Sequence, residues 1–236
     1  MNDPLVFLPG MMCDARQFWP QLVEFGSGRA VMVAPLTGAS SIGAMAAQVL
    51  EAAPRRFSLA GHSLGGVVAM EMLRRAPERI ARLALMDCTA LTETPQAAAG
   101  REPQIVAVRV GRLSALIRED LGPRSLAPGP RRGETLDLLV EMAEALGPEV
   151  FIAQSRALQR RPDQQKVLSG AKVPTLVLCG EGDVICPLKR HEFMAELIPN
   201  AGLSVIGGAG HMPMLEQPCA TNAALRSWLE GPAALR

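Results

Sequence analysis

Short, mainly apolar runs alternate with amphipathic stretches through the first part of the chain. The runs lie at residues 6–8, 30–33, 57–60 and 83–86, and Pro9-Gly10 and Pro35 end the first two, as is typical of buried strands. Between them, apolar residues recur at helical spacing over residues 41–53 and 64–76. Strands that alternate with helices predict a doubly wound α/β fold, in which a mainly parallel sheet has helices on both faces.

The alternation stops after Asp87. No strand is predicted from about residue 90 to residue 166, where apolar spacing predicts three helices, at roughly residues 102–120, 134–146 and 148–159. Gly and Pro make up six of the twelve residues 122–133, which predicts an irregular loop. We expect residues 90–166 to be a helical cap, or lid, inserted into an α/β core domain formed by residues 1–89 and 167–236.

Strands and helices alternate again in the last part of the chain. Residues 175–179 and 203–206 are predicted strands, and residues 188–198 and 219–229 are predicted helices. The sheet is therefore expected to hold about six strands. A chain of 236 residues is long enough to bury a real core, and its composition, 48% hydrophobic and 20% charged, is that of an ordinary globular protein.

Charge and aromatic content narrow the range of partners. Lys and Arg number 24 and Asp and Glu number 23, so the formal net charge of +1 provides no basic surplus to bind a phosphate backbone or an anionic membrane. Aromatic residues make up only 3% of the chain and Tyr is absent, which removes the stacking platforms that single-strand binders use. We expect a small-molecule substrate, with neither nucleic acid nor a membrane as partner.

The five cysteines indicate neither a disulfide framework nor a zinc site, because none forms a CxxC pair and none clusters with histidine. No metal or cofactor is expected. The N-terminal residues have no basic segment followed by a long apolar one, and no run approaches ~18 consecutive apolar residues. A cytoplasmic location is expected, and unpaired cysteines fit such a reducing compartment.

The strongest chemical motif is Gly61-His62-Ser63-Leu64-Gly65-Gly66, at the junction between a predicted strand and a predicted helix. A Ser on so sharp a turn needs small neighbours two positions before and after it, and Gly61 and Gly65 meet that need. The turn lifts the hydroxyl clear of the sheet, and the helix N-terminus offers N–H groups to a developing anion. Ser63 is therefore predicted to be a nucleophile.

A serine nucleophile needs a histidine base and a third group that orients the histidine. Of the three histidines, His62 adjoins Ser63 and is expected to point away from its pocket, and His191 falls within a predicted helix. His211 lies in a Gly-rich loop directly after the last predicted strand, at the carboxyl edge where open α/β sheets bind ligands. We therefore predict His211 as the base.

Two acids follow predicted strands at the same edge of the sheet. Asp183 comes just after the strand that ends at Cys179, and Asp87 just after the strand that ends at Met86. The chain order serine, acid, histidine favours Asp183, since the three groups then come from successive loops. Asp87 is kept as the alternative acid.

These residues resemble the α/β-hydrolase family across nearly the whole chain. Gly61-His62-Ser63-Leu64-Gly65-Gly66 is similar to the family's nucleophile elbow, Gly180-Glu181-Gly182-Asp183 to its acid turn, and Gly210-His211 to its histidine loop. The insertion at residues 90–166 is similar to the family's cap domain. The pattern also resembles small bacterial esterases and the enol-lactonase and C–C hydrolase branches of the family.

Two departures from the family pattern affect these expectations. Members usually begin with an antiparallel hairpin, but here the first predicted strand starts by Leu5. We therefore expect six strands rather than eight, a less protected sheet edge, and either a monomer or a homodimer. The family's oxyanion loop often carries His-Gly, whereas this chain has Leu8-Pro9-Gly10-Met11. The resemblance implies that the N–H groups of Met11 and Leu64 form the oxyanion hole, with Met12 as the weaker candidate.

The prediction is a serine hydrolase that cleaves a small, mainly apolar carboxylic ester or lactone through an acyl-enzyme, without a cofactor or a metal. Met12 and Met212 are expected to line its substrate pocket as adaptable apolar surface. Fold and triad leave the electrophile open, so a C–C bond hydrolase, a perhydrolase and a lyase stay as alternatives. A non-catalytic receptor for a small ligand is an alternative of a different class.

Overall fold

The computed structural model describes residues 3–232 and contains a six-stranded sheet. The strands are β1 (Leu5–Leu8), β2 (Val31–Val33), β3 (Phe57–His62), β4 (Ile80–Met86), β5 (Thr175–Gly180) and β6 (Ala201–Ile206). Their order across the sheet is β2-β1-β3-β4-β5-β6, and each pair of neighbours is parallel. The predicted doubly wound α/β sheet of six strands is confirmed.

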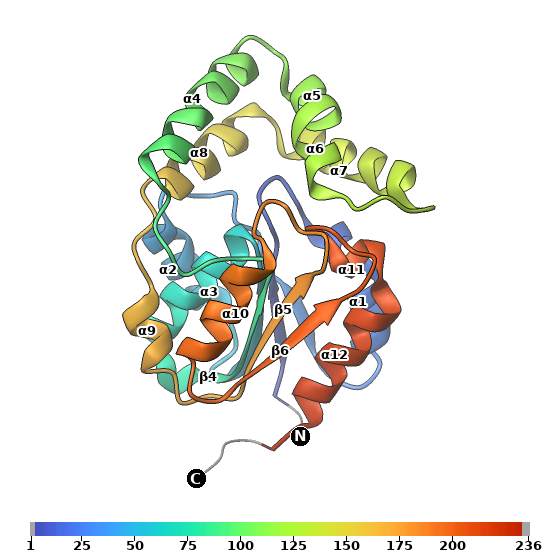
Figure 1. The fold of residues 1–236 in the computed structure, drawn as a ribbon. Coiled ribbons are helices and arrows are strands. Elements are labelled where there is room, and N and C mark those ends of the chain that lie inside the picture. The colour runs from blue at the N-terminus through green and yellow to red at the C-terminus, as the bar shows by residue number, and fades with distance from the viewer. Residues whose placement is uncertain (1–2, 233–236) are drawn as a thin grey trace.

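Helices cover both faces of the sheet (Figure 1). One face carries α2 (Ile42–Ala52), α3 (Leu64–Arg75), α9 (Gln165–Ser169) and α10 (Leu188–Leu197). The other carries the turn η1 (Ala15–Phe18), α1 (Trp19–Phe25), α11 (Pro213–Glu216) and α12 (Pro218–Glu230), and a short turn, η2 (Pro77–Arg79), precedes β4. Because both faces are covered, β1, β3 and β5 are buried along their whole length, which explains their nearly uninterrupted apolar sequences.

The central helix α3 carries the nucleophile motif into the core. Residues 64–73 of α3 are all buried, because the helix lies between the sheet and the helices α2 and α9. The start of α3 is therefore fixed against the end of β3. A residue at that junction has little freedom to move.

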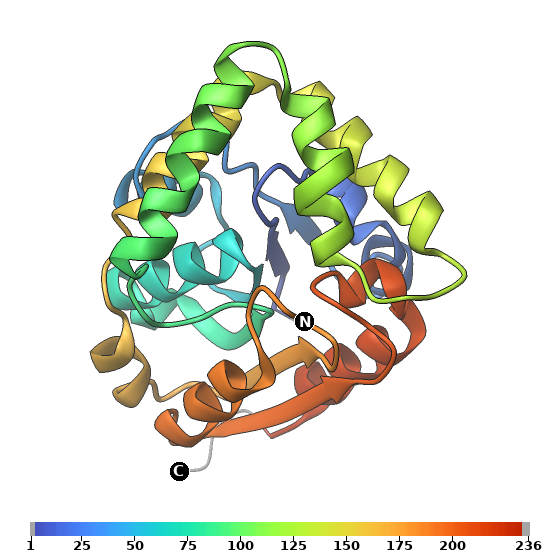
Figure 2. The same ribbon diagram turned by 45° about the horizontal axis from the view of Figure 1, so that its top comes forward.

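A helical segment, residues 90–166, follows β4 and lies over the carboxyl ends of the strands (Figures 1 and 2). Its elements are α4 (Pro95–Arg109), α5 (Leu113–Leu116), the π-helical turn η3 (Ile117–Leu121), α6 (Gly122–Ser125), α7 (Arg132–Leu146) and α8 (Pro148–Gln159). Helix α4 packs on α8, and α5, η3 and α6 pack on α7. The segment is helical throughout its described secondary structure, while its division from the core as a separate cap domain stays a prediction.

The helical segment differs from its prediction at three points. Helix α4 begins at Pro95, not near residue 102, because the Thr94 side chain accepts a hydrogen bond from the amide of Ala97 and caps the helix. The helix ends at Arg109, not near residue 120, and Gly111 just beyond it has a φ of 83°. Helix α6 occupies the start of the predicted loop. In the rest of the chain, the short helices α1, α9 and α11 have no counterpart among the predicted helices.

Candidate active site

Ser63 occupies the sharp turn between β3 and α3. Its backbone has a φ of 51° and a ψ of −112°, a strained conformation for a residue with a side chain. Two glycines allow the chain to pass so closely. A Cβ atom on Gly61 would overlap the carbonyl of Gly65, and a Cβ atom on Gly65 would overlap the carbonyl of Leu8 in β1. The turn therefore requires glycine at both positions.

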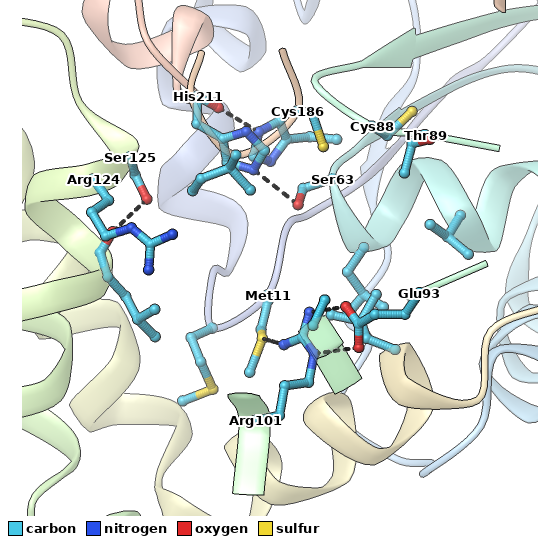
Figure 3. Close-up of a pocket in the computed structure, with 18 of the residues that line it drawn as sticks. Met11, Ser63, Cys88, Thr89, Glu93, Arg101, Arg124, Ser125, Cys186 and His211 are labelled. Carbon is cyan, nitrogen blue, oxygen red and sulfur yellow. Dashed lines mark hydrogen bonds and ion pairs between the residues drawn. The ribbon is translucent and has the colours of Figure 1, made fainter. Parts of the chain in front are cut away.

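Ser63, His211 and Asp183 form one chain of hydrogen bonds. Ser63 Oγ lies 3.0 Å from His211 Nε2 (Figure 3), and His211 Nδ1 lies 2.8 Å from Asp183 Oδ2. Burial would raise the pKa of Asp183, but the charge and hydrogen bond of His211, together with two backbone amides, outweigh that effect and the pKa is lowered. Asp183 Oδ1 also accepts hydrogen bonds from the amides of Ile185 and Cys186, at 2.8 and 3.0 Å. The structure thus holds an ionised carboxylate against the imidazole.

Glu216, the last residue of α11, holds the loop that carries His211. Its Oε1 accepts hydrogen bonds from the two amides that flank His211, at 2.9 and 3.0 Å. Its Oε2 accepts another from the amide of Ala127 in the helical segment, at 2.7 Å. The amide of His211 itself donates to the carbonyl of Ser125, at 2.7 Å. The backbone around the imidazole is therefore tied both to α11 and to the helical segment.

His62 lies beside His211, contrary to the expectation that its side chain points away from the pocket. The two ring centres are 4.9 Å apart, and His62 Nε2 is 2.7 Å from the backbone carbonyl of His211. Burial, and after it the nearby His211, lower the pKa of His62 to about 3, so its ring is neutral. Because a carbonyl only accepts, Nε2 donates to it, and Nδ1 accepts from Gln17 Nε2 at 2.6 Å.

The two expected oxyanion donors lie in the loop after β1, for Met11, and at the start of α3, for Leu64. The amide of Met12 donates to Gln154 Oε1 at 2.8 Å, so that N–H is already committed. Within residues 3–232 the amide of Met11 donates no hydrogen bond, and Leu64, as the first residue of α3, has no acceptor for its amide within the helix. This arrangement favours Met11 and Leu64 over Met12 as donors to an anion.

Two buried glutamines that fix this loop were missed by sequence reasoning. Gln17 Oε1 accepts a hydrogen bond from the amide of Gly10, at 2.9 Å. Gln154, on α8, holds Met12 with its oxygen and donates its nitrogen to the carbonyl of Leu36, at 3.0 Å. A single glutamine in an amphipathic stretch carries no sequence signal, because the partners of Gln154 lie more than a hundred residues away.

Asp87, the alternative acid, is fully buried behind Asp183. Its Oδ1 accepts a hydrogen bond from the amide of Gly180 at 2.9 Å, and its Oδ2 has no hydrogen-bond partner among the described residues. Burial, and after it the charge of Asp183, raise the pKa of Asp87 well above its usual value. The lowered pKa of Asp183 favours its ionised form beside His211, whereas the raised pKa of Asp87 favours its protonated form.

His191, the remaining histidine, is also buried, in α10. Its Nε2 accepts a hydrogen bond from the amide of Cys88, at 3.2 Å. Burial lowers its pKa to about 4, so its ring is neutral. This contact joins α10 to the segment after β4 and leaves His191 a structural residue, in line with its position inside a predicted helix.

A cavity of about 540 Å³ borders Ser63 and His211. Met12 and Met212, the two methionines expected to line the pocket, both border it. The helical segment contributes apolar side chains to the same wall, among them Leu139 and Phe151. A volume of this size suits a small organic ligand.

One group of side chains near the site has ligand types that a metal could use. The donor atoms of Asp183, Cys186 and His211 lie within 4.8 Å of one another. Burial raises the pKa of the Cys186 thiol, which disfavours the thiolate that a metal needs, and His211 Nδ1 is already bonded to Asp183. Asp183 and His211 therefore fit the hydrogen-bond chain to Ser63 better than a metal centre.

Comparison with known proteins identifies the class to which this fold and site belong. A model of the alpha/beta hydrolase family matches residues 5–224, and the chain belongs to that family. A solved thermophilic esterase from Thermogutta terrifontis superposes with a TM-score of 0.87 at 29% identity, over 97% of this chain and 90% of that one. The shared fold therefore extends over the helical segment as well as the sheet.

Two curated relatives are similar to this chain in sequence. A pimeloyl-[acyl-carrier protein] methyl ester esterase of Klebsiella pneumoniae is 32% identical over 196 residues, which cover 78% of this chain and 73% of that protein. The biotin biosynthesis bifunctional protein BioHC of Teredinibacter turnerae is 26% identical over 97% of this chain, which spans only 45% of that longer protein. Separately, none of the helices within residues 3–232 has the length and apolar character needed to cross a membrane.

Proposed function

We propose that this protein is a serine hydrolase that cleaves a small carboxylic ester or lactone through an acyl-enzyme. The observation that carries the proposal is the hydrogen-bond chain from Ser63 Oγ through His211 to Asp183, with steps of 3.0 and 2.8 Å. Membership of the alpha/beta hydrolase family supports hydrolysis, and the esterases among the similar proteins support an ester as substrate.

The first half of the reaction transfers the acyl group to the enzyme. As Ser63 Oγ attacks the ester carbonyl carbon, His211 Nε2 takes the hydroxyl proton, and Asp183 stabilises the imidazolium that results. The carbonyl oxygen becomes negative and receives hydrogen bonds from the amides of Met11 and Leu64, at the N-terminal end of α3, where the helix dipole also favours an anion. His211 then protonates the leaving alcohol as the C–O bond breaks.

The second half of the reaction returns the enzyme to its starting state. A water molecule attacks the acyl carbon, and His211 takes one of its protons as the new bond forms. The tetrahedral intermediate collapses, the acid is released, and Ser63 Oγ receives the proton from His211. A lactone follows the same two steps, except that the alcohol stays attached to the acid.

Covalent labelling of the nucleophile tests this proposal. A fluorophosphonate should modify Ser63, located by peptide mass spectrometry, because the reagent reacts with an activated serine hydroxyl. Ser63→Ala should lose the label and lower kcat on esters by about 10⁵-fold. The exposed Ser40 provides the control, since Ser40→Ala should label and turn over like the parent protein.

Circular dichroism of each variant shows whether the protein that was labelled and assayed is folded. A folded parent protein that takes no label, or takes it at another residue, would overturn the proposal. If the label is confirmed, a panel of esters and lactones graded by acyl length then ranks the substrates by kcat/KM.

A further inference from the structure

The cavity at Ser63 has an unusual set of charges in its wall. Among the described residues that line it are one glutamate and four arginines: Glu93, Arg101, Arg124, Arg161 and Arg190. The chain as a whole has a formal net charge of only +1. The positive excess is therefore a property of this cavity and does not follow from the overall composition.

Glu93, Arg101 and Arg161 form a cluster that is largely shielded from water. Arg101 Nε and Nη2 each lie 2.8 Å from a Glu93 carboxylate oxygen, and Arg161 Nη1 lies 3.3 Å from one of those oxygens. The side chains are 5%, 20% and 13% exposed in that order. One carboxylate thus balances two guanidinium groups, and a positive charge is left over in a partly desolvated wall.

The cluster also keeps unused hydrogen-bond donors. In the described part of the chain, the partner of Arg101 Nη1 is the thioether of Met11, a weak acceptor, at 3.7 Å. Arg161 donates from Nε to the carbonyl of Leu91, at 2.9 Å, while its Nη2 has no acceptor within residues 3–232. Burial lowers the pKa of Arg161, as expected when a charge lacks full solvation. A second carboxylate would accept hydrogen bonds from the unused donors and would balance the excess positive charge.

A second glutamate with two arginines shows that pairing alone does not make a binding site. Glu71 on α3 binds Arg74 and Arg75, whose side chains are 53% and 35% exposed. Water solvates the extra charge there, on a surface outside the cavity. In the Glu93 cluster both arginines line the cavity, which a ligand can enter.

Met11 links the cluster to the reacting centre. Its amide is the donor proposed for the oxyanion, and its thioether touches Arg101 Nη1. Figure 3 shows the Met11 side chain next to the Arg101 guanidinium, with a dashed line joining the two. A substrate whose carbonyl oxygen lies at the Met11 amide would therefore find Arg101 one side chain away along the same wall.

We propose that Arg101 and Arg161 bind a carboxylate of the substrate, so that the ester cleaved by this protein is an anion. The inference rests on the proposed function and adds the class of substrate. The compounds that fit are half-esters of dicarboxylic acids, or esters of hydroxy acids, in which an apolar chain separates the carboxylate from the scissile ester. Glu93 keeps the two guanidinium groups side by side.

Matched pairs of esters test this preference. Methyl half-esters from succinate to suberate are compared with neutral methyl alkanoates of the same chain length, which places the carboxylate on the acyl side. Acetate esters of hydroxy acids and of plain alkanols place it on the alcohol side. In at least one series the anionic member should have a kcat/KM about tenfold or more above its neutral partner, mainly through KM, because charge-assisted hydrogen bonds are strong in a desolvated wall.

Variants separate binding of the carboxylate from a purely structural role of the cluster. Arg101→Gln and Arg161→Gln should each lower the ratio of anionic to neutral kcat/KM by about tenfold or more. Arg109→Gln, on the same helix α4 but outside the cavity, should keep the parent ratio. If the cluster only braced the fold, both rates would fall together and the ratio would not change.

The outcomes also separate this inference from the proposed function. Neutral and anionic esters cleaved equally well in both series would overturn the carboxylate site and leave the serine hydrolase in place. A folded protein that cleaves none of them would overturn the proposed function and this inference with it.

Discussion

The floor and the roof of the cavity are built in different ways. The floor consists of the loops after β1, β3, β4, β5 and β6. Close backbone packing, such as that of Gly65 on the carbonyl of Leu8, holds it together with buried side chains such as that of Gln17. The roof is the helical segment, which reaches the cavity with long side chains such as that of Arg101. The outer surface of the roof leaves Val106 and Val110 57% and 71% exposed.

Because they are built differently, the floor and the roof are suited to different steps of the reaction. A backbone turn fixes an atom closely, whereas a long side chain keeps several rotamers and adapts to what it binds. The floor therefore suits bond breaking and the roof suits the choice of substrate. Changes in the floor should lower turnover of every substrate alike, and changes in the roof should alter the ranking of substrates.

The largest of the following effects is expected at Asp183. Asp183→Asn leaves the shape of the floor but removes the charge that stabilises the His211 imidazolium, so kcat near neutral pH should fall by about 10⁴-fold. The loss should be equal for a neutral and an anionic ester, measured by steady-state kinetics. A loss confined to one ester class would contradict the division between floor and roof.

The second effect concerns the stability of the floor. In Gly65→Ala the added methyl group would overlap the carbonyl of Leu8, and β1 and α3 would have to separate. We expect the free energy of unfolding, from urea denaturation, to fall by about 3 kcal/mol. A variant as stable as the parent would show that the turn yields, and that the floor is less rigid than the structure implies.

The third effect is smaller and comes from Asp87. Because its raised pKa favours the neutral carboxyl and, within residues 3–232, it makes no hydrogen bond with His211, Asp87→Asn should change kcat by less than about tenfold. If Asp87→Asn instead proves more damaging than an equally stable Asp183→Asn, the orienting acid is Asp87.

The raised pKa of Asp87 also predicts how the stability of the protein depends on pH. The raised pKa means that the folded state binds a proton that the unfolded state loses above about pH 4, so the contribution of Asp87 to stability is present at low pH and falls as pH rises. Asparagine does not titrate. The melting temperature of Asp87→Asn minus that of the parent should therefore increase from about pH 4 to about pH 7.

The smallest effect is expected in the roof. Gly100 lies within α4, and a Cβ atom there would meet no other atom within 4 Å. Gly100→Ala should stabilise the protein by about 0.5–1 kcal/mol in urea denaturation, since alanine loses less backbone entropy in a helix. Destabilisation would show that the roof is packed as tightly as the floor.

The core of the fold is predictable because burial on both faces leaves a simple pattern. Strands such as β3 and β5 are short apolar runs, and Pro148 and Gly147 mark the start of α8. Helix α1 escapes prediction because its sequence is not amphipathic, with Trp19 and Val23 65% and 64% exposed. The end of α4 is not predictable from the sequence either, because a single glycine does not show whether it will adopt a positive φ.

The candidate site is predictable where each residue stands in a glycine-rich loop after a strand. Ser63, Asp183 and His211 share that local context, and the structure brings them within hydrogen-bonding distance, although their catalytic roles stay predictions. Gln154 and Arg101 lack such a context. Their positions depend on how the helical segment packs on the core, which no local pattern encodes.

The hydrogen bonds of Glu216 have a consequence for how substrate enters the cavity and how product leaves it. Because Glu216 binds the amide of Ala127, and His211 donates to the carbonyl of Ser125, lifting α6 would remove support from the base itself. On the opposite side, the contact between Arg101 of α4 and Met11 of the floor is a weak one. We expect molecules to enter and leave beside α4, so that the motion of this helix, rather than that of α6, sets the rate of product release.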